Sequence, residues 1–190
     1  MKFILLIGAA AACGTAFAAE NVLTFDPPQT QIHWTLGTAL HTVHGTFHLK
    51  GGTVRFDPAT GKASGQLVVS ATSGESGNDG RDKKMHQAIL ESAKFTDIVF
   101  TPDKVSGQVA PQGKSQIQVH GAFKLHGTDH DFTMPVDVEM KEGGQAAIAS
   151  SHFTIPYIKW GLKNPSVFML KVNDAVAIEI QASATVVAVH

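Results

Sequence analysis

The stretch that decides the fold is VHGAFKLHGTDHDFTMPVDVEM, residues 119–140. Apolar and polar residues alternate on either side of a Gly-Thr-Asp turn at residues 127–129, and successive side chains of a strand point to opposite faces. One face gathers the apolar side chains of Val119, Phe123, Leu125, Phe132, Met134, Val136, Val138 and Met140. The other face carries His120, Lys124, Asp131, Thr133, Asp137 and Glu139. The pattern predicts an antiparallel hairpin with one buried face and one solvated face.

Similar alternating segments recur along most of the chain. Further strands are expected at residues 32–36, 43–49, 53–56, 65–71, 98–101, 146–155 and 175–185. Turns are expected at Gly51-Gly52, at residues 57–61 and at residues 142–144, where Gly, Pro and Asp cluster. About eight antiparallel strands in one domain form either a sandwich or a closed barrel. Gly45 and Gly121 fall on apolar faces, where a missing side chain lets another backbone or a ligand approach closely, or lets the strand bend.

A single helix is expected, at residues 81–92. Asp79 is its predicted N-cap, and Met85, Ile89 and Leu90 lie at helical spacing. Residues 73–80 are rich in Gly, Ser and Asn and are expected to form an exposed loop. A lone amphipathic helix in a β-rich chain is typical of a cover over one end of a barrel.

The N-terminus has the pattern of a secretion signal. Lys2 is followed by an apolar segment at residues 3–12 and by Ala16-Phe17-Ala18, an A-x-A cleavage site. We therefore expect residues 1–18 to be a cleaved signal peptide and residues 19–190 to be one mature domain in the periplasm or outside the cell. The apolar segment is too short to span a membrane. The residues before Cys13 lack the bulky residue of a lipoprotein signal, so we expect no lipid anchor.

Cleavage at that site narrows the chemistry of the mature chain. Cys13, the only cysteine, is lost, so the product has neither a disulfide nor a cysteine nucleophile. Loss of Lys2 from the 15 basic residues leaves 14 against 16 acidic ones, a net charge of −2. This balance argues against a nucleic-acid or anionic-membrane surface.

Neither catalysis nor metal binding is the favoured reading. The sequence has no G-x-S-x-G motif, and Asp131, Asp137 and Glu139 lie on a solvated strand face. His44 and His48 share a face but stand four residues apart, about 13 Å at the rise of a strand, which is too far for one ion. The pair His44 and His120 leaves a metal or haem binder as the first alternative.

Polar residues crowd the start of the predicted helix. Arg81, Asp82 and His86 are candidates for a ligand-head site at the mouth of a barrel, and a solvated helix N-terminus explains them equally well. Tyr157 and Trp160 lie in a Pro- and Gly-containing segment, where they suit either core packing or the rim of a pocket.

The order of motifs resembles the YceI-like family of bacterial polyisoprenoid-binding proteins. The matching motifs are Gly45-Thr46-Phe47, Val54-Arg55-Phe56-Asp57, Arg81-Asp82 with Met85, Leu90-Glu91-Ser92-Ala93-Lys94-Phe95, the segment 121–128 and Met134-Pro135-Val136. His130 stands where the family more often has Arg. The resemblance implies an all-β, lipocalin-like antiparallel barrel of about eight strands, whose interior holds a long isoprenoid chain. It implies no enzymatic activity.

The physics of a barrel agrees with a tail-binding site. A small barrel either fills its interior with side chains or holds one ligand. At about 0.8 kcal/mol per buried methylene, a five-carbon isoprene unit gains up to roughly 4 kcal/mol, so three or four units offset the entropy of association. A tail-driven binder tolerates several head groups, and the sequence does not choose among them.

We therefore expect a lipid carrier or buffer with no resident cofactor, no metal and no nucleic-acid partner, and the sequence leaves a homodimer open. The candidate tail-lining residues are Phe47, Leu49, Val119, Phe123, Leu125, Phe132, Met134, Val136, Val138, Ile178 and Ile180. The candidate head-group residues at the rim are Arg81, Asp82, His86, Tyr157 and Trp160. A second alternative is a non-catalytic, partner-binding β module, which would have a fully packed interior.

Overall fold

The computed structural model describes residues 20–166 and 171–189, so the predicted signal peptide lies outside the described residues. In chain order the elements are β1 (Glu20–Phe25), η1 (Pro27–Gln29), β2 (Gln31–Gly37), β3 (Thr42–Phe56), β4 (Ala63–Glu75), α1 (Asp79–Lys84), η2 (Met85–Ile89), β5 (Asp97–Ser106), β6 (Gly113–Leu125), β7 (Thr128–Lys141), η3 (Glu142–Gly144), β8 (Ala146–Ile155) and β9 (Val176–Val189). The expected all-β architecture with one short helix is confirmed. No helix among the described residues is long and apolar enough to cross a membrane.

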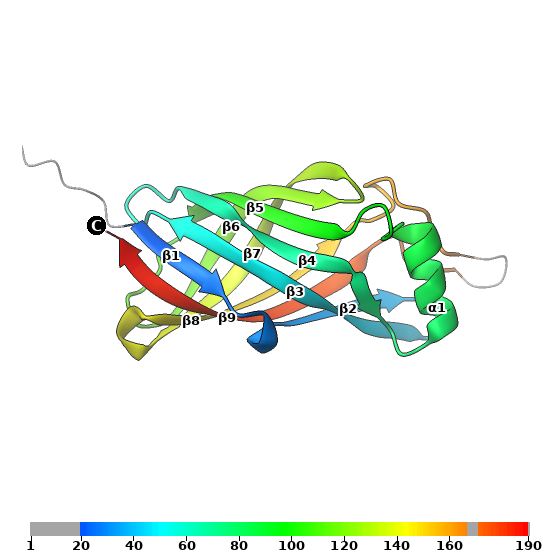
Figure 1. Cartoon of the computed structure of the whole chain (residues 1–190), viewed down its shortest axis with the longest axis horizontal. Coiled ribbons are helices and arrows are strands. Elements are labelled where there is room, and N and C mark those ends of the chain that lie inside the picture. The colour runs from blue at the N-terminus through cyan, green and yellow to red at the C-terminus, as the bar shows by residue number, and fades with distance from the viewer. Residues whose placement is uncertain (1–19, 167–170, 190) are drawn as a thin grey trace, which may run out of the picture.

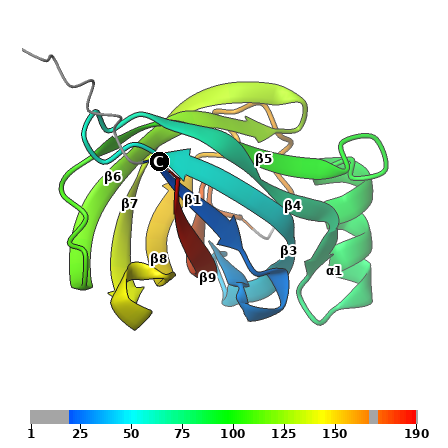
Figure 2. The ribbon, with the colours of Figure 1, turned by 60° about the vertical axis from the view of Figure 1, so that its left-hand side comes forward.

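The strands close into an elongated antiparallel barrel (Figures 1 and 2). Nine strands fill eight positions, because β1 and β2 follow one another in a single position between β3 and β9. Asp26-Pro27-Pro28 separates β1 from β2, since proline cannot donate to a strand ladder. Pairing of β4 with β3 closes the circle.

The decisive hairpin forms as the alternation predicts. Strands β6 and β7 pair from Gly113 with Met140 to Leu125 with Thr128. The turn is the two-residue pair His126-Gly127 rather than Gly-Thr-Asp, and both residues have positive φ, 52° and 80°. Such a turn matches the twist of the two strands it joins.

Other local predictions require correction. Gly51-Gly52 is not a turn, because β3 continues through it to Phe56 with a shift of register against β4 between Leu49 and Gly51. The dipeptide is therefore the site of an irregularity within a long strand, which is another use of glycine in a sheet. The expected loop at residues 73–80 is shorter, because β4 extends to Glu75.

The helix begins earlier than predicted. Its N-cap is Asn78, whose Oδ1 accepts the backbone N–H of Arg81 at 3.0 Å. The helix runs from Asp79 through α1 and a wider turn, η2, and ends at Ile89. Asp79, the predicted N-cap, is instead the first helical residue; Asn and Asp are comparable N-caps, so cap preference does not separate the two positions. Helix α1 lies at one end of the barrel (Figure 1), which is the placement expected for a cover.

The interior has two apolar regions. The cluster toward the end opposite α1 contains the buried residues Ile117, Val138, Ala147 and Val186. The cluster nearer α1 contains Phe100, Leu125, Met134, Phe153, Ile155, Tyr157 and Leu162. The second region surrounds the cavity described next.

Candidate ligand cavity

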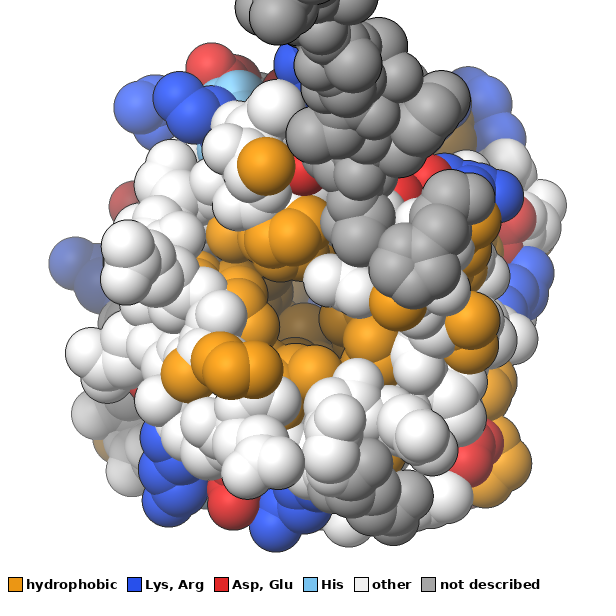
Figure 3. Space-filling view, turned by 90° about the vertical axis from the view of Figure 1, so that its left-hand side faces the viewer, with side chains coloured by type: hydrophobic (Ala, Val, Ile, Leu, Met, Phe, Trp, Pro, Cys, Tyr) orange, Lys and Arg blue, Asp and Glu red, His pale blue; other side chains and the backbone are white. Residues whose placement is uncertain are grey.

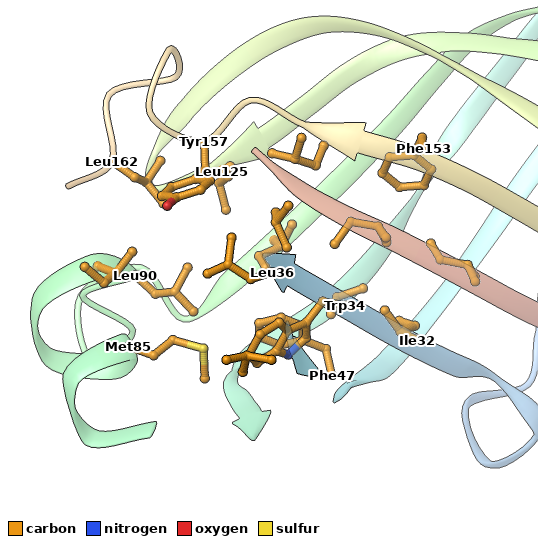
Figure 4. Close-up of a pocket in the computed structure, with 18 of the residues that line it drawn as sticks. Ile32, Trp34, Leu36, Phe47, Met85, Leu90, Leu125, Phe153, Tyr157 and Leu162 are labelled. Atoms are coloured by element: carbon orange, nitrogen blue, oxygen red, sulfur yellow. The ribbon is translucent and has the colours of Figure 1, made fainter. Parts of the chain in front are cut away.

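An apolar cavity of about 600 Å³ occupies the barrel interior from its middle to the α1 end (Figure 4). Its volume falls within the range of about 300–1,000 Å³ that is usual for ligand pockets. The walls are formed by Phe25, Thr30, Ile32, Trp34, Leu36, Thr38, His41, Val43, Phe47, Leu49, Leu67, Val69, Gly80, Arg81, Lys84, Met85, Ile89, Leu90, Ile98, Phe100, Phe123, Leu125, Met134, Phe153, Ile155, Tyr157, Leu162, Pro165, Val172, Val176, Ile178, Ile180 and Ala182. The fully packed interior required by the partner-binding alternative is therefore absent.

The cavity reaches exposed residues at the α1 end. The exposed residues His41, Arg81 and Lys84 lie on its wall there, and Lys84 Nζ donates to the backbone oxygen of Pro165 at 2.8 Å. We call this region the mouth. Figure 3 looks at the opposite end of the barrel, which is hollowed at its centre and ringed by hydrophobic side chains.

The predicted tail-lining residues divide into two groups. The residues that line the cavity are Phe47, Leu49, Phe123, Leu125, Met134, Ile178 and Ile180. The residues that do not line it are Val119, Phe132, Val136 and Val138. Contact of either group with a ligand stays a prediction.

Position along the strand explains this division. Met134 lines the cavity, whereas Val136 and Val138 lie farther along β7 and pack toward the end opposite α1, with Ile117 of β6. Val119 packs between the two interior clusters. Alternation therefore gave the correct face of the strand, but it carries no information on depth within the barrel.

Phe132 belongs to an aromatic wall behind the cavity. Its ring lies 5.7 Å from that of Phe123 and 5.3 Å from that of Phe153, both edge-on, and these two neighbours line the cavity. Edge-to-face rings at such distances stabilise the wall beyond the area they bury.

Trp160 belongs to the same wall. Its indole stacks on the imidazole of His130 at 4.1 Å between ring centroids and contacts the rings of Phe123 and Phe132. Burial lowers the pKa of His130, which favours the neutral imidazole against the Trp160 ring. Trp160 does not line the cavity.

The remaining rim candidates have structural partners. Arg81 Nε donates to Ser76 Oγ at 2.7 Å, and an Nη donates to the Ser76 carbonyl at 3.0 Å. Asp82 accepts both the backbone N–H and the hydroxyl of Ser76. Burial alone raises the pKa of Asp82, but the two Ser76 hydrogen bonds, with Arg81 nearby, bring it below its ordinary value. Arg81 lines the mouth and anchors the connection from β4 to α1, whereas Asp82 does only the latter.

His86 and Tyr157 also form internal hydrogen bonds. His86 Nδ1 lies 2.9 Å from Ser92 Oγ, and its Nε2 lies 2.8 Å from the carbonyl oxygen of Gly74, so the ring ties η2 to β4. Tyr157 lines the cavity, and its hydroxyl donates to the carbonyl of Asn173 at 2.7 Å. Burial, helped by Asp174, raises the pKa of Tyr157 to about 12. Its phenol therefore stays protonated at neutral pH and is not a general base.

Sequence reasoning missed much of the cavity wall. Alternation at Ile32, Trp34 and Leu36 of β2 was recognised, yet these residues were not assigned to a site. All three line the cavity. The signal was present, but only closure of the barrel shows that β2 faces the same space as β6 and β9.

The histidine pair considered for metal binding is separated. His44 lies on β3 and His120 on β6, with β4 and β5 between them. His44 Nδ1 contacts Thr35 Oγ1 at 3.0 Å, whereas His120 lies between Asp103 and Asp131, 2.6 Å from each carboxylate. In residues 20–166 and 171–189, no group of three or more His, Cys, Asp or Glu side chains is arranged to hold a metal ion.

The fold and the cavity define a closed antiparallel barrel with an apolar interior large enough for a ligand. Comparison with known families then matches the YceI-like domain over residues 23–184. The chain belongs to the YceI-like family. Comparison with curated proteins gives no match.

Solved structures share this fold at low sequence identity. BcnA of Burkholderia cenocepacia superposes with a TM-score of 0.68 at 16% identity, covering 85% of this chain and 99% of that one. A polyisoprenoid binding domain from Saccharophagus degradans, implicated in plant cell wall breakdown, gives 0.61 at 14% identity, covering 86% and 97%. The YCEI protein of Campylobacter jejuni gives 0.56 at 17% identity, covering 70% and 79%.

Proposed function

We propose that this protein binds one long isoprenoid lipid in its barrel and acts as a carrier or buffer for that lipid in the periplasm or outside the cell. The observation that carries the proposal is the apolar cavity of about 600 Å³. An empty apolar space of this size forgoes the packing contacts that normally stabilise a protein interior. A bound hydrocarbon chain supplies them.

The energetics favour a tail-driven complex. Each isoprene unit that enters the cavity gains up to roughly 4 kcal/mol by the area rule. The polyisoprenoid binding domain from Saccharophagus degradans shares the fold, which supports the same ligand class here. The secretion signal pattern at residues 1–18 supports the location.

A charged end of the ligand, where present, belongs at the mouth. Arg81 and Lys84 are there, and cationic side chains bind phosphate or carboxylate by charge-assisted hydrogen bonds of about 1.5–3 kcal/mol. The protein has no catalytic role in this proposal.

Native mass spectrometry tests the proposal. Protein purified gently from its native source and protein produced in a foreign host are compared, and organic extracts of both are analysed. We expect a single bound lipid with an isoprenoid mass increment in the native preparation. A native preparation that is always empty would count against lipid binding. N-terminal sequencing beginning at Ala19 supports export, and a mature protein that retains residues 1–18 contradicts it.

A further inference from the structure

The wall of the cavity stops inside the barrel. On β9 the wall contains Ile178, Ile180 and Ala182 but not Ala184, the next residue on the same face. It stops in the same way on three further strands, where the last wall residue and the nearest inward-facing side chain beyond it are Phe25 and Leu23 on β1, Phe123 and Val119 on β6, and Met134 and Val136 on β7. The cavity therefore extends toward the mouth and has an inner end near Ala182.

Buried apolar side chains lie beyond this inner end. Val119 and Val136 pack against both interior clusters. None of the four buried residues of the cluster toward the end opposite α1 belongs to the wall. A hydrocarbon chain that enters from the mouth meets these side chains where the wall ends.

The polarity of the wall sets the direction of the ligand. The cations Arg81 and Lys84 lie at the mouth, whereas the inner end is lined by the apolar side chains of Phe25, Met134 and Ala182. Figure 4 shows the wall between them running from Met85 and Leu90 near α1 to Ile32 and Phe153. A polar or charged end of the ligand therefore stays at the mouth, because its burial among apolar side chains is costly, and the apolar tail points toward Ala182.

The volume of the cavity limits the number of carbons that fit. An apolar protein cavity of about 150 Å³ accommodates the six carbons of benzene, which is about 25 Å³ per carbon. At this ratio the cavity of about 600 Å³ holds about 24 carbons. Each isoprene unit has five carbons, so roughly four to five units fill the space.

We infer that the protein selects isoprenoid chains by length, that it prefers chains of about four to five units, and that Ala182 is a length-determining residue at the inner end of the cavity. The inference rests on the proposed lipid-binding function and narrows its ligand class. A unit beyond the fifth finds no further wall to contact and stays in water, so a longer chain gains nothing from its extra carbons.

A mixture of chain lengths tests the inference. Phosphatidylcholine vesicles carry equimolar prenyl alcohols of three, four, five, six and eight isoprene units. Delipidated protein is incubated with them until the bound species no longer change with time, and native mass spectrometry identifies those species. All units of a chain lie in hydrocarbon in the vesicle, so a unit left outside the barrel disfavours transfer to the protein. We expect mainly the four- and five-unit alcohols to be bound, and the eight-unit alcohol to be at least about 10-fold less abundant.

Ala182→Phe should shorten the preferred chain. The substitution adds six carbons at the inner end, about the volume of one isoprene unit, so the main bound species should become shorter by about one unit. Ala177→Phe is the matched control and should leave the bound species unchanged. Ala177 lies on the same strand with its side chain on the outer face, where it pairs with Thr35 and Thr154. Ala182→Leu adds half as many carbons and should reduce the share of five-unit chains.

The measurement on the wild-type protein needs no variant to fold. Binding of the eight-unit alcohol as readily as the four-unit alcohol overturns the length limit. Unchanged bound species in both Ala182 variants, or the same shift in Ala177→Phe, overturns the role of Ala182. Failure of the wild-type protein to bind any of the alcohols overturns the proposed function itself.

Discussion

His120 lies between two carboxylates and gives a testable pH dependence. Hydrogen bonds to Asp103 and then to Asp131 raise the pKa of His120. A raised folded-state pKa contributes stability that is fully present below the unfolded value of 6.5 and is lost as the pH rises through the folded value. His120→Gln should therefore lower the melting temperature at pH 5.5 and have little effect at pH 9.

The control for this prediction is His44→Gln, which removes a histidine that contacts a threonine hydroxyl rather than a carboxylate. Its effect on the melting temperature should be nearly the same at both pH values. If His120→Gln lowers the melting temperature equally at pH 5.5 and pH 9, the ion pairs contribute nothing measurable. High salt should reduce the effect, because the imidazole is partly exposed.

Gly121 allows two strands to approach closely. A Cβ atom at residue 121 would lie 2.2 Å from the Thr101 carbonyl oxygen and 2.7 Å from Pro102 Cα. Both neighbours are backbone atoms, which move only if the strands themselves shift. Gly121→Ala should therefore lower the free energy of unfolding by about 1–3 kcal/mol.

Gly80→Ala is the matched control. It adds a methyl group to α1, where the nearest atom is 3.5 Å away, and should stabilise by about 0.5–1 kcal/mol. Urea unfolding measures both, and equal effects would refute the steric account.

At the scale of the element, Arg81 links β4 to α1. The guanidinium holds Ser76 through its hydroxyl and its carbonyl. Arg81→Ala should lower the melting temperature, corresponding to about 1 kcal/mol or less because the side chain is exposed. Lys83→Ala, the control, changes an exposed cation of the same helix and should leave the melting temperature unchanged.

Lipid retention tests whether Arg81 has a second role, in binding the head group of the ligand. Loss of bound lipid without loss of stability would make Arg81 a head-group ligand, and loss of stability with lipid retained would make it an anchor.

The elements also show what a sequence can and cannot predict. Alternation in residues 119–140 gave both strands of the β6–β7 hairpin and the buried face of each, because side-chain direction in a strand is a local property. Depth is not local. The same face of β7 lines the cavity at Met134 and is packed at Val138. The sharing of one barrel position by β1 and β2 depends on pairing with β3 and β9, which no local pattern encodes.

For the whole molecule, closure removes the free strand edges and encloses one interior, in which the cavity extends toward α1 and a cluster of buried residues lies toward the other end. Strand β9 crosses both regions. Ala182 lines the cavity, and Ala184, two residues farther on the same face, is buried at 5% exposure outside the cavity wall and pairs with Ala147 of β8. The two alanines lie on the same face of the same strand. They differ in that the side chain of Ala182 faces the cavity and that of Ala184 does not.

Substitution of these two alanines by leucine should have opposite effects on stability. In the delipidated protein, Ala182→Leu places three further carbons in an apolar void and should stabilise by up to about 2 kcal/mol at 0.8 kcal/mol per carbon. Ala184→Leu adds the same carbons at a buried position outside the cavity wall, beside Ala147, and should destabilise by about 1–3 kcal/mol. The Ala182 variant should also retain less lipid, because its side chain occupies ligand space. Urea unfolding and lipid extraction measure these effects. Two equally destabilised variants would mean that the barrel interior has no usable void at Ala182.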